Sequence, residues 1–64
     1  MSGIVKRIRH EKGFGFILGS DGKEYFFHMT ALKNIRFEQL EVGSEVEFED
    51  VMADKGLRAE EIFV

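Results

Sequence analysis

Apolar and polar residues alternate along much of the chain, and this period of two predicts short β-strands. Phe14, Phe16 and Leu18 share one face of the clearest such segment, because successive side chains of a strand point to opposite faces. Gly15 and Ile17 occupy the other face. The segment is therefore predicted to be a strand with two chemically different sides.

A second strand is predicted at residues 24–29, directly after a tight turn. The turn contains an Asp21-Gly22 pair, and such a pair accepts the positive φ angles of a two-residue hairpin. The two strands should therefore pair antiparallel. Phe26 and His28 share one face of the second strand. The opposite face carries Tyr25, Phe27 and Met29.

Three further strands are indicated, one before this pair and two after it. Residues 3–10 form a β-branched segment with basic side chains. In residues 42–51, acidic residues alternate with apolar ones, which predicts a half-buried strand with an acidic outer face. An Asp-Lys-Gly sequence then predicts a short hairpin loop before the final strand, residues 57–64. That strand breaks its alternation between Ala59 and Ile62, which indicates a β-bulge.

The pattern is weaker between residues 29 and 43. Thr30 is placed to cap one helical turn at residues 31–33, followed by a loop that exposes Phe37. The alternative is a short helix that carries Leu32, Ile35 and Leu40. We favour the loop. Five short strands with turn signals and no long helix predict a small all-β barrel or sandwich.

Composition restricts the kind of protein that this chain can be. A chain of 64 residues is long enough for one domain, and we expect residues 1–64 to form it. The chain contains no cysteine, which excludes disulfides and zinc-thiolate sites and suits a reducing compartment. No apolar run near the start resembles a secretion signal or a membrane span, so a cytoplasmic protein without membrane contact is expected.

No catalytic, metal or cofactor site is expected. His10 and His28 are the only histidines, and a metal site would have to recruit carboxylates as its other ligands. A histidine between two apolar residues is better explained as a partly exposed stacking or hydrogen-bonding group. No serine occurs with a histidine and an acid in a recognisable nucleophile motif, so an enzyme is not predicted.

Charge is distributed unevenly, although the net charge is only −3. Residues 1–37 carry seven lysines or arginines and three acids, a balance of +4. Residues 38–64 carry two bases and nine acids, a balance of −7, and the two parts sum to −3. If the fold separates these parts, one face attracts phosphate and the other repels it. The alternative is that both patches are solvated surface without a partner.

Aromatic side chains share one face of the two central strands. If Ile17, Tyr25 and Phe27 fill the core, that face must meet solvent, and an exposed apolar patch implies a partner. Rings bordered by cations suit single-stranded nucleic acid, because rings stack on bases while cations hold phosphates. The patch consists of Phe14, Phe16, Phe26 and His28, and the basic residues that precede it are Lys6, Arg7, Arg9 and Lys12. The alternative interpretation reverses the faces and places these phenylalanines in the core.

Several motifs resemble those of one known family. Residues 12–17 (KGFGFI) match the first ribonucleoprotein motif of cold-shock domains, and residues 25–29 (YFFHM) resemble the second. The similarity extends to residues 3–6, 37–43 and 46–48. It implies an all-β, five-stranded antiparallel Greek-key barrel of the oligonucleotide-binding fold, which presents its second and third strands to nucleic acid.

By this resemblance, seven positions match family residues that contact nucleic acid: Lys6, Lys12, Phe14, Phe16, Phe26, His28 and Phe37. Three more expected contacts depart from the family pattern. Arg7 stands where the family usually has tryptophan, Arg9 where it has asparagine, and Met29 where it has phenylalanine. Because two large stacking surfaces are missing, weaker binding with a steeper salt dependence is expected.

The expected function is that of a monomeric, non-enzymatic domain that binds single-stranded RNA or DNA. Such a domain acts as an RNA chaperone or a regulator of gene expression. The alternative is a protein-interaction barrel whose aromatic patch docks a peptide or a partner domain. A salt titration separates the two, because only nucleic-acid affinity falls linearly with salt on a log-log plot.

Overall fold

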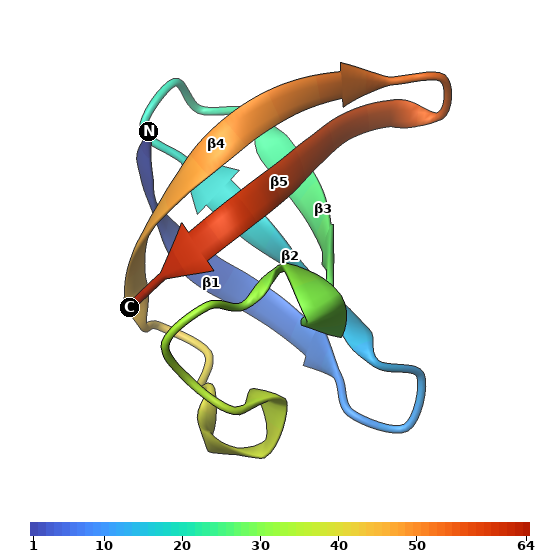
Figure 1. The fold of residues 1–64 in the computed structure, drawn as a ribbon. Coiled ribbons are helices and arrows are strands. Elements are labelled where there is room, and N and C mark those ends of the chain that lie inside the picture. The colour runs from blue at the N-terminus through green and yellow to red at the C-terminus, as the bar shows by residue number, and fades with distance from the viewer.

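The computed structural model describes residues 1–64 and contains five strands and two short 3₁₀ turns. The strands are β1 (Ser2–Arg9), β2 (Phe14–Gly19), β3 (Glu24–His28), β4 (Glu45–Ala53) and β5 (Gly56–Phe63), and the turns are η1 (Met29–Ala31) and η2 (Phe37–Gln39). The strands close into a barrel in the order β1-β2-β3-β5-β4 (Figure 1). The predicted all-β, five-stranded barrel is confirmed. No helix is both long enough and apolar enough to cross a membrane.

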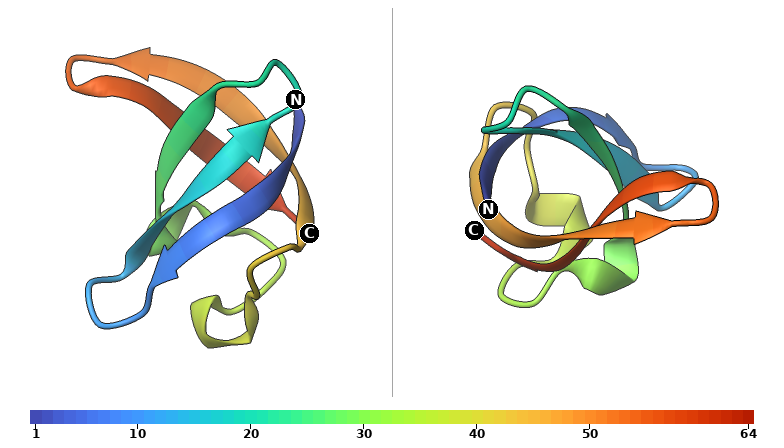
Figure 2. Two further views of the ribbon diagram at one scale, coloured as in Figure 1. Left: turned by 180° about the vertical axis from the view of Figure 1, so that it is seen from behind. Right: turned by 90° about the horizontal axis from the view of Figure 1, so that it is seen from above.

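The barrel is built from a three-stranded meander and a hairpin. β1, β2 and β3 pair in succession, β4 and β5 form the hairpin, and β4 also pairs with β1, all antiparallel. β3 and β5 complete the ring through one parallel pairing, between Phe26 and Arg58. The strand pattern did not indicate this parallel closure. Figure 2 shows the ring end-on, with the β4–β5 hairpin extending beyond it.

Ten buried apolar side chains fill the interior, and every strand contributes to them. Gly15 also faces inward: a Cβ atom there would lie 2.5 Å from the carbonyl oxygen of Arg7 and 2.8 Å from the Phe27 ring. The β1 backbone and this ring therefore occupy the space that a side chain would need. The buried apolar residues are Val5, Ile17, Tyr25, Phe27, Ala31, Leu40, Val46, Phe48, Ala59 and Ile62.

Two β-bulges interrupt the pairing of the strands. In β5, Ala59 and Ile62 are both buried although they are three residues apart, and Glu61 between them has a φ of +50°. The pairing between β4 and β5 shifts by one residue at this point, which confirms the predicted bulge. The second bulge lies at Lys6 in β1, where the pairing with β2 also shifts. Val5 and Ile8 both pack on the core three residues apart, a break that the sequence interpretation did not use.

The connection between β3 and β4 is a loop with two single 3₁₀ turns, and the alternative of a short helix that carries Leu32, Ile35 and Leu40 is wrong. The first turn begins at Met29, earlier than the predicted residues 31–33. Its cap is His28 and not Thr30, because the His28 Nδ1 atom accepts a hydrogen bond from the Thr30 amide at 3.3 Å. The cap therefore lies two residues before the predicted one.

The ends of two strands also differ from the prediction. β3 ends at His28, so Met29 turns outward with 46% of its surface exposed and does not share the inner face of the strand. β4 begins at Glu45 rather than at residue 42. Gly56, the last residue of the predicted hairpin loop, has a φ of +126° and is the first residue of β5.

Candidate nucleic-acid interface

Three phenylalanines and a histidine gather on the outer face of β2 and β3. The register places Phe14 opposite His28 and Phe16 opposite Phe26, so the four side chains form two adjacent cross-strand pairs. All four are half-buried, whereas the residues that alternate with them face the core. The predicted assignment of faces is therefore confirmed, and the interpretation that placed these phenylalanines in the core is wrong. Phe14, Phe16 and Phe26 are termed the aromatic cluster.

The rings of the aromatic cluster touch at an angle and do not stack on one another. Their centroids are 5.4 Å apart for Phe14 and Phe26, 5.9 Å for Phe16 and Phe26, and 6.1 Å for Phe14 and Phe16. The interplanar angles of these pairs are 41°, 72° and 87° respectively. Tilted and edge-to-face contacts fix the rings in place. No ring of the cluster is therefore stacked face to face on another.

Two arginines flank the aromatic cluster from opposite sides. On β1, Arg7 pairs with Phe16, and its Cζ atom lies 5.7 Å from the centroid of that ring. On β5, Arg58 pairs with Phe26, and its Cζ atom lies 5.6 Å from that centroid. Both distances are within the range of cation–π interactions. One row, Arg7–Phe16–Phe26–Arg58, thus crosses four strands and is termed the cross-strand row.

Arg58 is a residue of this surface that the sequence interpretation missed. It belongs to the acidic half of the chain, and only the parallel closure of β3 and β5 brings it to Phe26. Its Nε atom is buried without a hydrogen bond, although the Oε2 atom of Glu60 lies 3.4 Å away. The side chain as a whole is 41% exposed, so the rest of the guanidinium group can reach a ligand. The only signal in the sequence was an isolated arginine in an acidic segment.

The other predicted cations border the aromatic cluster on its β1 side. Arg9 pairs with Phe14, and Lys12 lies in the turn between β1 and β2; both are exposed and neither forms an ion pair. Lys6 reaches across β2 to Glu24 on β3, with 3.2 Å between its Nζ atom and the carboxylate. An exposed ion pair contributes only about 0–1 kcal/mol, so Lys6 can exchange this carboxylate for a phosphate.

Phe37 and Met29 lie beside a hollow at one end of this surface. Phe37 is half-buried rather than fully exposed, and its ring packs against His10 at a centroid distance of 5.3 Å. Met29 lies close to Gly13. The hollow has a volume of about 560 Å³ and is lined by His10, Met29, Ile35, Arg36, Phe37 and Glu38. The sequence interpretation did not include His10 among the contacts.

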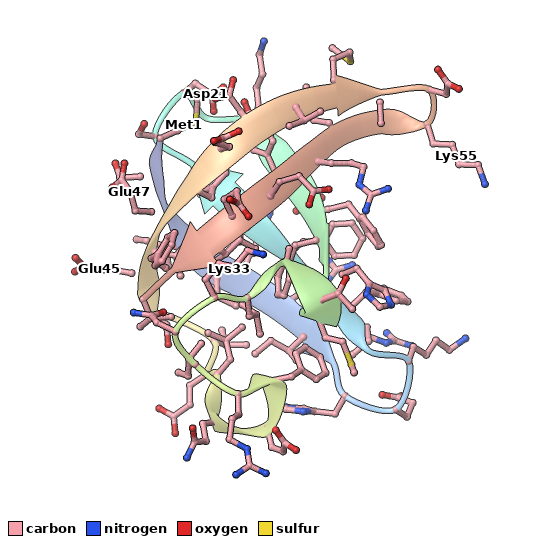
Figure 3. The ribbon with its side chains drawn as sticks, viewed as in Figure 1. Met1, Asp21, Lys33, Glu45, Glu47 and Lys55 are labelled. Atoms are coloured by element: carbon pink, nitrogen blue, oxygen red, sulfur yellow. The ribbon has the colours of Figure 1, made fainter.

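A second hollow, of about 580 Å³, adjoins the aromatic cluster at Phe16 and Phe26. Residues 53–58 of the β4–β5 hairpin, including Arg58, form its other side. Lys55 projects from the tip of this hairpin (Figure 3). The aromatic cluster thus shares Phe16 and Phe26 with this hollow, and the first hollow begins at Met29, the residue after His28.

The turn between β2 and β3 is held by a hydrogen bond that the Tyr25 hydroxyl donates to Asp21 Oδ2 at 2.6 Å. This bond stabilises the carboxylate and the protonated phenol, so it lowers the pKa of Asp21 and raises the pKa of Tyr25 to about 12. The Tyr25 ring also packs against Phe48 at 5.1 Å in the core. The turn that joins the two aromatic strands is thus tied to the barrel interior.

The whole chain matches a known protein family. The family model described as the 'Cold-shock' DNA-binding domain covers residues 1–64. The chain belongs to the cold-shock domain family. Cold shock protein CapB of Pseudomonas syringae pv. tomato is 40% identical over 63 residues, which cover 98% of this cold-shock domain and 91% of the relative. Cold shock protein CspB of Geobacillus stearothermophilus is 44% identical over 57 residues, which cover 89% of this domain and 86% of the relative.

A solved structure has the same fold within a longer protein. The structure titled drosophila Unr CSD456 matches this cold-shock domain with a TM-score of 0.78 and 26% sequence identity over 97% of the domain. The domain spans 25% of that longer chain. The resemblance carried by the motifs of β2 and β3 is therefore confirmed for both family and fold. The aromatic cluster lies on a domain of a nucleic-acid-binding family.

Proposed function

We propose that this cold-shock domain binds single-stranded RNA or DNA along the cross-strand row, with bases stacked on the rings and phosphates held by the cations. One observation carries the proposal: half-buried rings lie between two guanidinium groups on a single outer face. Stacking contributes roughly 1–3 kcal/mol per base and tolerates any sequence, because every base has a π-face.

The proposed contacts are of two kinds. The stacking and apolar contacts are Phe14, Phe16, Phe26, His28, Met29 and Phe37. The cationic contacts are Lys6, Arg7, Arg9, Lys12 and Arg58. A guanidinium group is planar and lies flat on aromatic rings, so Arg7 can extend the stack at the position where the family usually has tryptophan.

The proposed biological role, as an RNA chaperone or a regulator of gene expression, requires binding alone. A protein that binds only the unpaired strand shifts the equilibrium toward the open form by mass action. No nucleotide hydrolysis, cofactor, metal or catalytic residue is needed for this. We propose that residues 1–64 work as one monomeric unit in the cytoplasm, without membrane contact, where the absence of cysteine suits reducing conditions.

A protein-docking role for the same surface is the second candidate. It is favoured by Arg7 and Met29, which replace two aromatic residues of the family pattern and make the platform for bases smaller. An apolar contact with a protein should respond little to salt, whereas nucleic-acid affinity should fall linearly on a log-log plot.

The deciding experiment is a salt titration of fluorescence anisotropy with labelled single-stranded oligonucleotides of varied base composition. Lys12→Ala should weaken all sequences similarly and reduce the salt slope by about one. Lys33→Ala is the matched control, because Lys33 lies outside the proposed contacts, in the loop after η1 beside Glu61, and should contribute little to the slope. Binding that does not depend on salt would make nucleic acid the wrong ligand and favour protein docking.

A further inference from the structure

A second group of exposed apolar side chains lies on the outer face of the barrel, over β1, β2 and the C-terminal end of β5. Ile4, Leu18, Phe63 and Val64 are between 39% and 50% exposed, which is unusual for four large apolar residues that lie close together. They line one hollow of about 560 Å³, which also includes residues of β1 and β4. The proposed nucleic-acid contacts do not include this surface.

Two glutamates complete the surface. The strand register puts Leu18, Ile4 and Glu45 in one row across β2, β1 and β4. It puts Ser2, Glu47 and Phe63 in the next row. Glu45 and Glu47 project from β4 into solvent (Figure 3). The six side chains Ile4, Leu18, Glu45, Glu47, Phe63 and Val64 are termed the apolar–acidic surface.

The charge of the apolar–acidic surface excludes nucleic acid as its ligand. No lysine, arginine or histidine lines the hollow. Glu45 forms no ion pair, and the partner of Glu47 is the terminal amine at 3.3 Å. A phosphate would meet the unpaired carboxylate of Glu45 here, whereas a cationic partner would neutralise it. Such a partner can also displace the terminal amine from Glu47, because an exposed ion pair is weak. The ion pair between Lys6 and Glu24, which spans β2, separates this surface from the aromatic cluster.

The spacing of the two glutamates indicates the shape of the partner. Glu45 and Glu47 are alternate residues of a strand and point to the same side, about 6.5–7 Å apart along it. Alternate residues of an extended peptide repeat at the same distance. A peptide that runs along β1 can therefore direct one set of side chains to the two carboxylates and the other set to Ile4 and Leu18.

We propose that the apolar–acidic surface docks a short extended segment of a partner protein in which lysine or arginine alternates with aliphatic residues. The aliphatic side chains pack on Ile4, Leu18 and Phe63, and the basic side chains pair with Glu45 and Glu47. Because this surface and the aromatic cluster are separate, the domain can hold a nucleic-acid strand and the partner segment at the same time.

The test uses a short labelled synthetic peptide of alternating lysine and isoleucine, with binding to the whole domain measured by fluorescence anisotropy in the absence of nucleic acid. Replacing both glutamates (Glu45→Gln with Glu47→Gln) should weaken binding about threefold or more. The matched control, Glu41→Gln with Asp54→Asn, removes the same charge elsewhere and should leave binding within about twofold of wild type. A peptide with serine in place of isoleucine should not bind.

Amide chemical shifts of the labelled domain locate the peptide, and changes confined to β1, β4 and the ends of β2 and β5 would support the proposal. Ile4→Ser should weaken binding without unfolding the domain, since Ile4 is half exposed, and a thermal melt checks this. Equal weakening by the control pair, or shift changes centred on the aromatic cluster, would overturn the proposal. So would self-association of the domain that Ile4→Ser abolishes, because the occupant would then be a second copy.

Discussion

Phe26 and Phe27 are adjacent residues of β3 that face opposite sides of the barrel wall, and this makes them a sensitive test of the proposed interface. Phe26 is half-buried on the outer face, and Phe27 is 0% exposed in the core. The same chemical change at neighbouring positions should therefore have opposite effects. Phe26→Ala should weaken binding and keep the fold, whereas Phe27→Ala should remove a large part of the free energy of unfolding.

The magnitudes follow from the contacts of each ring. Phe26 offers one stacking surface, and stacking of about 1–3 kcal/mol per base corresponds to a roughly 5- to 150-fold change in Kd. Removal of the Phe26 ring also removes the cation–π contact with Arg58 at 5.6 Å. This contact holds the guanidinium group in place by about 0.5–1 kcal/mol. For folding, replacing a buried phenylalanine costs about 3–5 kcal/mol. The free energy of unfolding of a domain of this size is roughly 3–10 kcal/mol in total. Phe27→Ala therefore removes a large part of it.

Two measurements on each variant check this prediction. Oligonucleotide affinity is read by fluorescence anisotropy, and the free energy of unfolding by urea titration with far-UV circular dichroism, since the chain has no tryptophan. Phe63→Ala is the control, because Phe63 is an exposed phenylalanine outside the aromatic cluster and should bind nucleic acid as wild type does. The proposed interface is wrong if Phe26→Ala binds as tightly as wild type. It is also wrong if the weaker binding of Phe26→Ala is explained entirely by a smaller fraction of folded protein.

Three further changes test other parts of the structure. Arg58→Ala should weaken oligonucleotide binding and lower the salt slope by about one, and an unchanged slope in the same anisotropy titration would remove Arg58 from the interface. Gly15→Ala should lower the free energy of unfolding by about 1–3 kcal/mol, because its Cβ would lie 2.5 Å from a β1 carbonyl oxygen; a variant as stable as wild type in urea would contradict this packing. Tyr25→Phe should flatten the pH dependence of stability at both ends. The raised pKa of Tyr25 gives a contribution that is complete below its ordinary value of 10.0 and lost as pH rises toward about 12. The lowered pKa of Asp21 gives one that is present above its ordinary value of 3.8 and lost as pH falls. Urea unfolding across this pH range measures both, and equal slopes for variant and wild type would show that the hydrogen bond contributes nothing.

Local alternation was enough to predict the faces of β2 and β3. In these strands glycine and large apolar residues alternate with the phenylalanines, and only one of the two faces can pack in a barrel this small. The same logic located the bulge in β5, because Ala59 and Ile62 must both reach the core although they are three residues apart. Where the burial of a side chain depends on its neighbours along the chain, local alternation predicts which side chains face the core.

Features that depend on distant parts of the chain could not be predicted in this way. The pairing of Phe26 with Arg58 arises from the closure of the barrel, and no local pattern records which strand lies beside β3. The bulge at Lys6 does leave a break in β1, because Val5 and Ile8 both pack on the core three residues apart, but the exposed Ile4 obscured it. The first 3₁₀ turn begins early because the His28 ring caps it, a choice between two hydrogen-bonding side chains that composition does not decide.

The uneven charge gives a polyanion one favourable direction of approach to this barrel. A net charge of −3 would disfavour nucleic acid if the acids were spread evenly over the surface. Instead, Glu45 and Glu47 project from β4 on the side of the molecule away from Lys55, which marks the hairpin beside the second hollow (Figure 3). Attraction is therefore concentrated where Arg7 and Arg58 flank the rings, and β4 repels a strand that begins to wrap around the barrel. The bound segment should then be limited to the cross-strand row and its two hollows, so that a longer strand recruits additional domains instead of encircling one.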